Sequence, residues 1–418
     1  MRLLFFSPRP FWPLDTGAKL RDYHLARQLA MRARVTYLSF GEIGAGAANA
    51  ALADGFERVV TVPRPPGYTP AKLMHGLCGP VPVTVLNYTT GAMKDALARL
   101  LAEGSFDAVQ LESVHLAEYL PVIRQMAPAR GIAPRIIVDW HNIESELMRR
   151  YSESAGSFPR RFYARATAAK LEACERKVLK LADAVCVPSQ RERDVVVQWA
   201  PEAAIEVVEN GVDAAHYREE AIEDACRERE VAPGAIVYVG SMDYHANIDA
   251  VLGFASEVWP RIHAQWPELS FQIVGRNPPA SVRALSSLPR VEVTGSVPDV
   301  RPYYRHALAA VVPLRVGGGT RLKILEALAA GTPVISTALG AEGLDVAAGR
   351  DILLAESAGD FVAAIGELRS NAGRRAALVH HGRLAVRSRY DWPVIGAGLY
   401  EFHQGLAAPD PRKGLRVA

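Results

Sequence analysis

Short apolar runs alternate with amphipathic segments along most of the chain. The first run, Leu3 to Phe6, is followed by a helical pattern and then by a second run, Val35 to Phe40. Apolar runs bounded by polar residues are typical of strands buried in a parallel sheet. A strand, a helix and a second strand in this order predict a β–α–β unit and an open α/β sheet.

The same pattern continues to about residue 208 and then begins again. It predicts a helix over Met93–Glu103, a strand that ends near Glu112 and His115, and a strand over Ile136–Val138. The charged segment REEAIEDACREREVAPG separates this series from a second one that begins with AIVYVGS. We therefore predict a first domain over 1–212, a linker over 213–234 and a second domain over 235–390. Residues 42–90 alternate small residues and prolines, and the segment PRPPGYTPAKLMHGLCGPVPVTV within them contains so many prolines that we expect no regular structure there.

One stretch of the second series, residues 311–344, contains most of the candidate ligand-binding residues. The apolar strand Val311 to Leu314 leads into a glycine turn, and Thr320 can cap the helix that follows. The N-terminus of a helix that begins beyond a strand suits a phosphate. Lys323 and Glu326 lie three residues apart and can share one helix face. The alternative is an ordinary strand–turn–helix with a Lys–Glu pair on its surface.

Within this stretch, the sequence GGGTRLKILEALAAGTPVIST resembles the donor-nucleotide motif of the retaining family 4 glycosyltransferases. That motif usually contains two glutamates eight positions apart. Glu326 matches the second one, which binds the nucleotide ribose in the family. The first falls on Gly318, so a glutamate that commonly contacts the donor sugar is absent. In this respect the motif resembles that of a subgroup of the family with the sequence GGGTRLKILEA.

The resemblance implies the GT-B fold, with two facing Rossmann-like, doubly wound α/β domains. The N-terminal domain would bind the acceptor, and a helix over 391–408 would cross back onto it. The expected reaction moves a sugar from a nucleotide-diphosphate sugar to an acceptor with retention of anomeric configuration. A glycan, a lipid-linked glycan or a small molecule would serve as acceptor. No cofactor and no essential metal are expected.

The resemblance also assigns a donor site. Related enzymes grip the donor pyrophosphate with an arginine and a lysine that align here with Ser241 and Ala246, so both cations are missing. Arg321, Lys323 and Arg276 are our candidates to replace them. The predicted donor-binding residues are Gly17, Gly240, Ser241, Arg276, Val297, Gly318, Gly319, Thr320, Arg321, Lys323 and Glu326.

A polar cluster, Asp139, His141 and Glu144, directly follows the strand at Ile136–Val138. Polar side chains beyond the end of a parallel strand lie in the crevice where open sheets bind ligands. These three residues are therefore our catalytic candidates. By resemblance, His141 matches a histidine that contacts the donor sugar, where it would orient the sugar and stabilise an oxocarbenium-like state. Alternatively His141 caps the next helix; a metal is less favoured because no second ligand stands at helix spacing.

Composition narrows the class of protein. Of 418 residues 49% are hydrophobic and 22% charged, which is typical of globular domains, and a net charge of +3 does not indicate a nucleic-acid partner. Four scattered cysteines favour neither a disulfide framework nor a zinc site and fit a cytoplasmic protein. No apolar stretch approaches the roughly 20 residues that span a bilayer.

Residues 149–180 form a basic helical region. This region could contact an anionic membrane surface from the cytoplasmic side or hold an anionic acceptor. The interspersed Glu172 and Glu175 favour a solvated helix face instead.

Two other functions share the predicted architecture. A non-hydrolysing nucleotide-sugar epimerase would need acid–base carboxylates around one bound sugar. A catalytically silent nucleotide-sugar-binding protein would agree with the missing glutamate and cations. A dinucleotide-dependent oxidoreductase is disfavoured because no GxGxxG follows the first strand.

Overall fold

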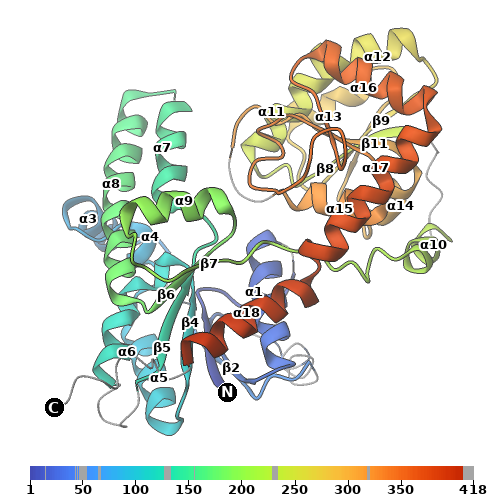
Figure 1. Ribbon diagram of the computed structural model, residues 1–418. Helices are drawn as coiled ribbons and strands as arrows, with labels where there is room; N and C mark the ends of the chain where they lie inside the picture. Colours follow the sequence, from blue (N-terminus) through green and yellow to red (C-terminus); the bar gives the residue numbers. More distant parts are fainter. Residues whose placement is uncertain are drawn as a thin grey trace. The chain divides into compact units, whose positions relative to one another are not determined.

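The computed structural model describes residues 1–14, 16–42, 44, 46, 54–64, 67–126, 133–154, 156–227, 234–317 and 321–407. The chain divides into two compact units (Figure 1). Unit 1 comprises Met1–Glu209 together with the described part of Ile395–Ala418, and unit 2 comprises Asn210–Val394. Each unit has its own parallel sheet and its own apolar core, so the predicted α/β class with two Rossmann-like units is confirmed.

Within the described residues, unit 1 contains a seven-stranded parallel sheet in the order β3-β2-β1-β4-β5-β6-β7. Its strands are β1 (Arg2–Ser7), β2 (Arg34–Phe40), β3 (Arg58–Val62), β4 (Ala108–Glu112), β5 (Arg135–Asp139), β6 (Ala184–Val187) and β7 (Ile205–Val207). The strand order reverses between β1 and β4, which makes this the switch point of a doubly wound sheet. Crevices for ligands form beside the carboxyl ends of the strands at such a point.

Helices cover both faces of this sheet. They are α1 (Gly17–Ala30), α3 (Pro70–Cys78), α4 (Val83–Leu86), α5 (Gly91–Glu103), η1 (Val114–Tyr119), α6 (Leu120–Met126), α7 (Glu144–Ser154), α8 (Phe158–Leu181), α9 (Gln190–Trp199) and α18 (Trp392–Ala407). Helix α1 begins after Thr16, whose side chain accepts a hydrogen bond from the Lys19 amide. Helix α18 returns from unit 2, and a Cβ on its Gly396 would lie 2.2 Å from Gln28 Cβ of α1. The two helices thus pack closely at a glycine.

The expectation of no regular structure in the segment PRPPGYTPAKLMHGLCGPVPVTV is wrong, because α3 and the start of α4 lie in it. Strand β3 pairs in register with β2, and helices α3 and α4 follow. Helix α3 tolerates its proline because Pro70 occupies the first turn, where the missing amide hydrogen bonds nothing within a helix. Thr69 caps this helix by accepting a hydrogen bond from the Lys72 amide.

Unit 2 contains a six-stranded parallel sheet within the described residues, in the order β10-β9-β8-β11-β12-β13. Its strands are β8 (Ala235–Val239), β9 (Phe271–Val274), β10 (Val291–Gly295), β11 (Ala307–Val312), β12 (Val334–Ser336) and β13 (Leu353–Leu354). The switch point of this sheet lies between β8 and β11. It is the counterpart of the β1–β4 boundary in unit 1.

The helices of unit 2 are α10 (Glu219–Arg227), α11 (His245–Gly253), η3 (Phe254–Val258), α12 (Trp259–Gln265), α13 (Ala280–Arg283), η4 (Ala284–Ser287), α14 (Arg301–His306), α15 (Leu322–Ala330), α16 (Ala358–Ser370), α17 (Ala372–Ala385) and η5 (Val386–Tyr390). The predicted linker, 213–234, contains α10 and belongs to unit 2, where Ile222 of α10 is buried. Helix α15 ends at Gly331, whose positive φ of 79° suits the left-handed cap of a helix.

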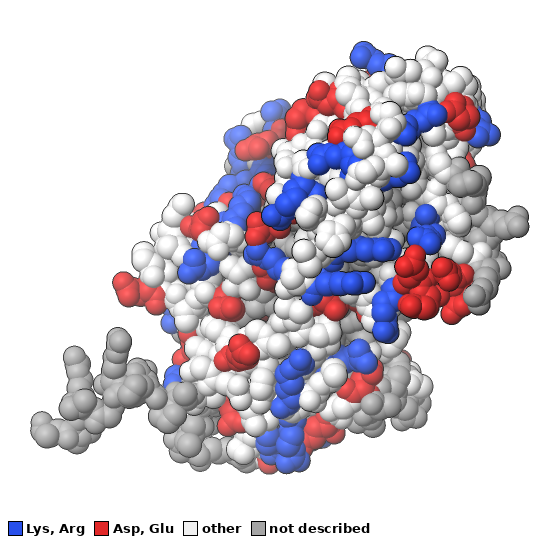
Figure 2. Space-filling model, turned by 45° about the vertical axis from the view of Figure 1, so that its right-hand side comes forward, with Lys and Arg blue, Asp and Glu red and all other residues white. Residues whose placement is uncertain are grey.

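Charges on the molecular surface are mixed in sign. On the face drawn in Figure 2, Lys and Arg side chains are interspersed with Asp and Glu. No helix among the described residues combines the length and the apolar character needed to cross a membrane.

A buried ion pair joins α1 to the sheet of unit 1. The Arg21 guanidinium group donates two hydrogen bonds to Asp139, with Nε–Oδ2 and Nη2–Oδ1 distances of 2.8 Å. The guanidinium also donates to the carbonyl groups of Val208 and Glu209. The side chains of Arg21 and Asp139 are 1% and 0% exposed, so each charge depends on the other for compensation.

Removing one partner of this pair should destabilise the protein strongly. We expect Arg21→Ala to lower the free energy of unfolding by about 3–5 kcal/mol, because Asp139 would remain buried without a counter-charge. Arg58→Ala is the matched control, since Arg58 and Glu103 form an exposed pair and should contribute about 0–1 kcal/mol. Urea unfolding measures both values, and equal losses for the two variants would contradict the expectation.

Candidate active site

Three strands of unit 1 end in polar residues at one edge of the sheet. Ser7 ends β1, Glu112 ends β4 and Asp139 ends β5, and Glu112 stands opposite Asp139 in the parallel register. Parallel strands bring these carboxyl ends to the same edge of the sheet. His141 follows two residues after Asp139, and Asp22 lies on α1.

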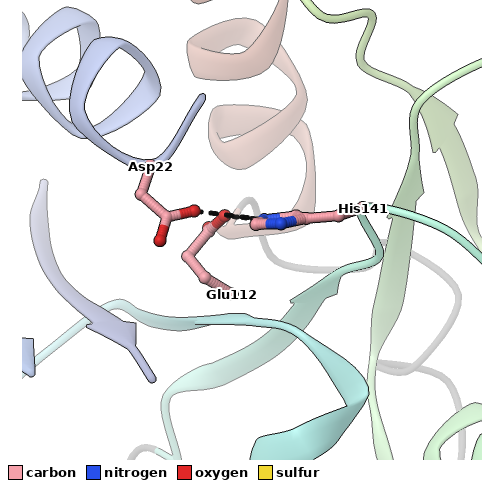
Figure 3. Close-up of side chains that lie close together, drawn as sticks. All are labelled: Asp22, Glu112 and His141. Carbon is pink, nitrogen blue, oxygen red and sulfur yellow. Dashed lines mark hydrogen bonds and ion pairs between the residues drawn. The ribbon is translucent and has the colours of Figure 1, made fainter. Parts of the chain in front are cut away.

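Asp22, Glu112 and His141 converge from three separate elements (Figure 3). His141 Nε2 lies 3.1 Å from Asp22 Oδ1 and 3.3 Å from Glu112 Oε2. Both carboxylates are fully buried, whereas the His141 side chain keeps 11% of its surface exposed. We call these three residues the His141 cluster. Its geometry leaves the imidazole reachable and holds its two carboxylate neighbours in the protein interior.

Further hydrogen bonds fix the two carboxylates. Ser7 Oγ donates to Asp22 Oδ2 at 2.6 Å, and Gln110 Nε2 donates to Glu112 Oε1 at 2.7 Å. Gln110 Oε1 in turn lies 2.6 Å from His403 Nε2 of α18. The cluster is therefore held by residues that are far apart in sequence.

Burial and neighbouring charges set the protonation of this cluster. Burial by itself would lower the pKa of His141, but Asp22 and Glu112 outweigh it and raise this pKa to about 9. Burial and the neighbouring Asp139 raise the pKa of Glu112 well above its usual range. Burial opposes ionisation of Asp139 too, yet the Arg21 guanidinium lowers its pKa. At neutral pH the imidazolium then balances Asp22, Arg21 balances Asp139, and Glu112 is favoured as the neutral acid.

The three catalytic candidates occupy different environments. His141 lies in the cluster, while Asp139 is engaged by Arg21 and lies behind it as a structural charge. Glu144 begins α7, and burial raises the pKa of its carboxyl group. Nearby, burial and then Arg9 lower the pKa of His115 to about 4, which favours the neutral imidazole.

The His141 cluster also offers a metal-ligand set. One ligand atom from each of its residues lies within 4.8 Å of the others. A histidine nitrogen and two carboxylate oxygens suit a divalent transition metal. The same distances equally suit an imidazolium shared between two carboxyl groups, so the geometry alone is compatible with either occupant.

In unit 2, Lys323 reaches across the carboxyl edge of the sheet. Its Nζ lies 2.7 Å from the Tyr238 hydroxyl group and 2.8 Å from Asn247 Oδ1. A Cβ on Gly240 would lie 2.8 Å from this Nζ, so a side chain there would displace the ammonium group. Burial, followed by repulsion from Arg321, lowers the pKa of Lys323 to about 7. The loop after β8 and the helix after β11 thus meet at Lys323, which at neutral pH is present in both its charged and its neutral form.

Glu326 lies one turn further along α15. Its Oε2 accepts a hydrogen bond of 3.4 Å from the Tyr304 hydroxyl group, and burial raises its pKa. Arg321 precedes the helix with a buried side chain and donates to the carbonyl group of Leu339 at 3.4 Å. Lys323 and Glu326 thus lie on α15, and Arg321 directly precedes it.

The other predicted donor residues vary in setting. Arg276 Nε donates to Ser241 Oγ and pairs with Asp243, so its charge is already compensated. Val297 packs half-buried against the core of unit 2, and Gly17 is exposed at the first turn of α1. Gly318, Gly319 and Thr320 lie outside the described residues.

Two cluster residues escaped the sequence predictions. Asp22 lies inside a helix pattern in which polar residues are ordinary, and Glu112 was noted only as the end of a strand. A usable signal existed for Glu112, since charged residues at the ends of buried parallel strands face the ligand crevice. Asp22 offered none, because its pairing depends on the rotation of α1 against the sheet.

Two family models match the chain. The model described as Glycosyltransferase Family 4 matches residues 22–216, and the model described as Glycosyl transferases group 1 matches residues 233–371. Together the two matches cover most of both units. The chain is a GT4-type glycosyltransferase. No curated protein sequence matches it.

Solved structures show the same fold. Sucrose-phosphate synthase from Thermosynechococcus elongatus is 18% identical with a TM-score of 0.69, over 97% of this glycosyltransferase and 99% of that chain. Anabaena HepE in complex with UDP and glucose is 16% identical with a TM-score of 0.64, over 97% and 100%. Trehalose 6-phosphate synthase from Burkholderia multivorans is 13% identical with a TM-score of 0.62, over 97% and 99%. The GT-B fold of the glycosyltransferase is thereby established.

The pKa of His141 gives the stability of the glycosyltransferase a specific pH dependence. Because this pKa is raised from 6.5 to about 9 on folding, its contribution is complete below about pH 6.5 and is lost as pH rises through 9. The free energy of unfolding should therefore fall over this range more steeply in the wild type than in His141→Gln.

Chemical denaturation at several pH values measures this difference, with His245→Gln, an exposed histidine of unit 2, as control. NMR titration should also show a lower pKa of His141 in Asp22→Asn, because the Asp22 carboxylate then no longer offsets the effect of burial on this pKa. A pH-independent difference between wild type and His141→Gln would contradict the assignment.

Proposed function

We propose that this glycosyltransferase moves a sugar from a nucleotide-diphosphate sugar to an acceptor with retention of anomeric configuration. The observation that carries the proposal is the placement of Lys323 and Glu326 on one turn of α15, at the carboxyl edge of the unit 2 sheet. A cation and a carboxylate at this spacing match the pyrophosphate and the ribose of a nucleotide donor. HepE forms complexes with UDP and glucose and with UDP-glucose, which supports the same donor class.

Lys323 is our candidate for the missing pyrophosphate cations. Its Nζ contacts Asn247, the residue after Ala246, where related enzymes have a lysine. The ammonium group thus comes from α15 instead of α11 and reaches a comparable place. Arg276 is the weaker candidate because Asp243 already neutralises it.

His141 is proposed to act on the sugar. When the bond between the anomeric carbon and the diphosphate oxygen breaks, positive charge develops on the sugar and negative charge on the leaving diphosphate. An imidazolium balanced by Asp22 can donate a hydrogen bond to a sugar hydroxyl group without adding net charge beside the developing cation. The acceptor proton would pass to the leaving diphosphate on the same face of the sugar. No metal is needed in this proposal.

Nucleotide binding tests the proposal directly. UDP, GDP, ADP and NAD would each be added to wild type and to Glu326→Ala, and thermal melting would be followed with and without EDTA. A ligand at about 100 times its Kd should add about 2.7 kcal/mol of stability. We expect one nucleoside diphosphate to raise Tm in the wild type, in EDTA as well, and to lose most of this effect in Glu326→Ala.

Glu268→Ala is the matched control, since Glu268 is an exposed glutamate of the same unit and should leave the shift unchanged. A shift with NAD alone, or with no nucleotide, would contradict the proposal. Product analysis without an acceptor separates a transferase from an epimerase, which would convert the donor sugar by itself.

Lys323 gives donor binding a second signature. With a pKa of about 7, the lysine is mostly neutral at pH 8, and a diphosphate should draw it into the charged state. Binding at pH 8 should therefore take up close to one proton, and this uptake should vanish near pH 6. Calorimetry in buffers with different ionisation enthalpies measures it. Lys323→Gln should abolish the uptake and Arg276→Gln should keep it. Binding by the wild type without proton uptake would contradict the assignment to Lys323, because an arginine is already charged at pH 8.

A further inference from the structure

Two helices of unit 1, α3 and α8, expose large apolar side chains. Helix α3 buries only Gly76, although Leu73, Met74 and Leu77 make up much of its sequence. At the start of α8, Phe158 and Phe162 are 75% and 67% exposed, while Met74 and Leu77 of α3 are 63% and 57% exposed. Exposed apolar patches on a globular protein mark contact with a partner or a membrane.

The two helices lie side by side. Lys170 Nζ of α8 donates to the carbonyl groups of Gly76 and Leu77 at 2.6 and 2.7 Å, which holds the C-terminal end of α3 against α8 (Figure 1). Both helices contribute exposed apolar side chains to the surface of unit 1, with Phe158 and Phe162 twelve and eight residues before Lys170 on α8. We call this set of side chains the α3–α8 patch; it consists of Leu73, Met74, Leu77, Phe158, Phe162 and Tyr163.

The orientation of α8 shows that its aromatic residues are unused in packing. Ala164, Ala168 and Leu171 are buried and define the helix face that packs on the protein. Phe158 and Phe162 are four residues apart and share the opposite face. An outward helix face normally carries polar side chains. Here it carries two phenylalanines, so folding of unit 1 does not explain them.

The charge of the patch has one sign. Helix α8 carries Arg160, Arg161, Arg165 and Lys170 between Phe158 and Lys170 with no acidic residue, and Lys72 is the charged residue of α3. The carboxylates Glu172 and Glu175 come only later in α8, where Glu172 pairs with Arg149 and Arg176. The acidic residues that would solvate the region are thus confined to its far half.

We propose that the α3–α8 patch docks this glycosyltransferase on an anionic lipid surface. Phenylalanine, leucine and methionine side chains insert at the boundary between head groups and acyl chains, and the flanking arginines meet lipid phosphates. A protein partner would need a complementary acidic surface, whereas a membrane supplies both the apolar and the anionic component over the whole patch. If the proposed function holds, docking brings unit 1 to acceptors carried on a lipid.

Vesicle flotation of the full chain tests this docking. One set of vesicles contains phosphatidylcholine alone, and in the other phosphatidylglycerol replaces part of it. We expect the wild type to float with the anionic vesicles and to stay behind with the neutral ones. Phe158→Ser/Phe162→Ser should lower the bound fraction at least about tenfold, because two inserted aromatic side chains are lost. Arg161→Gln/Arg165→Gln should weaken binding, and this loss should resemble the effect of added salt.

Leu384→Ser is the control, since Leu384 is an exposed leucine of unit 2 and should leave flotation unchanged. Nucleotide-induced melting shifts should persist in the phenylalanine double variant, which separates failure of docking from failure of the proposed function. The proposal is overturned if the wild type does not float, if it floats equally after both phenylalanines are replaced, or if those replacements merely dissociate a dimer that binds no vesicles.

Discussion

The bond between Arg21 and Asp139 determines how the candidate active site of unit 1 is assembled. Arg21 precedes Asp22 on α1, and Asp139 lies two residues before His141, so the pair joins the two segments that carry two of the three cluster residues. A buried arginine and aspartate add little net stability over apolar residues of the same size. Their geometry is nevertheless specific, since the guanidinium fork accepts one orientation of the carboxylate. Rotating α1 would break this pair and move Asp22 away from the imidazole.

The two units place different polar and charged groups at the same position of their sheets. Each places its polar side chains at the carboxyl edge of a parallel sheet, beside the point where the strand order reverses. Unit 1 gathers an imidazole and two carboxyl groups there, whereas unit 2 gathers a lysine, an amide and two tyrosine hydroxyl groups. The loops at these edges carry the chemistry, and the sheets beneath them supply rigidity.

Patterns within single segments allowed most of the fold to be predicted. The strands at Val35–Phe40 and Ile136–Val138 were recognisable because buried parallel strands are continuously apolar, and His141 because it directly follows one. Asp22 could not be found this way, since its partner stands more than a hundred positions away. Helix α3 was missed because its proline was interpreted as a helix breaker, although proline fits the first turn. The exposed Met74 and Leu77 became informative only once α3 was known to leave them outside.

Helix α18 gives unit 1 an unusual order of synthesis. Unit 1 is interrupted by the whole of unit 2, and its last helix is the last described element of the chain. On the ribosome, Gln110 and the surface of α1 around Gln28 would wait for His403 and Gly396 until nearly the entire polypeptide had emerged. Unit 2 can complete its core during this interval, whereas unit 1 cannot. A truncated chain that ends after unit 2 would therefore contain a complete unit 2 and a unit 1 that lacks α18.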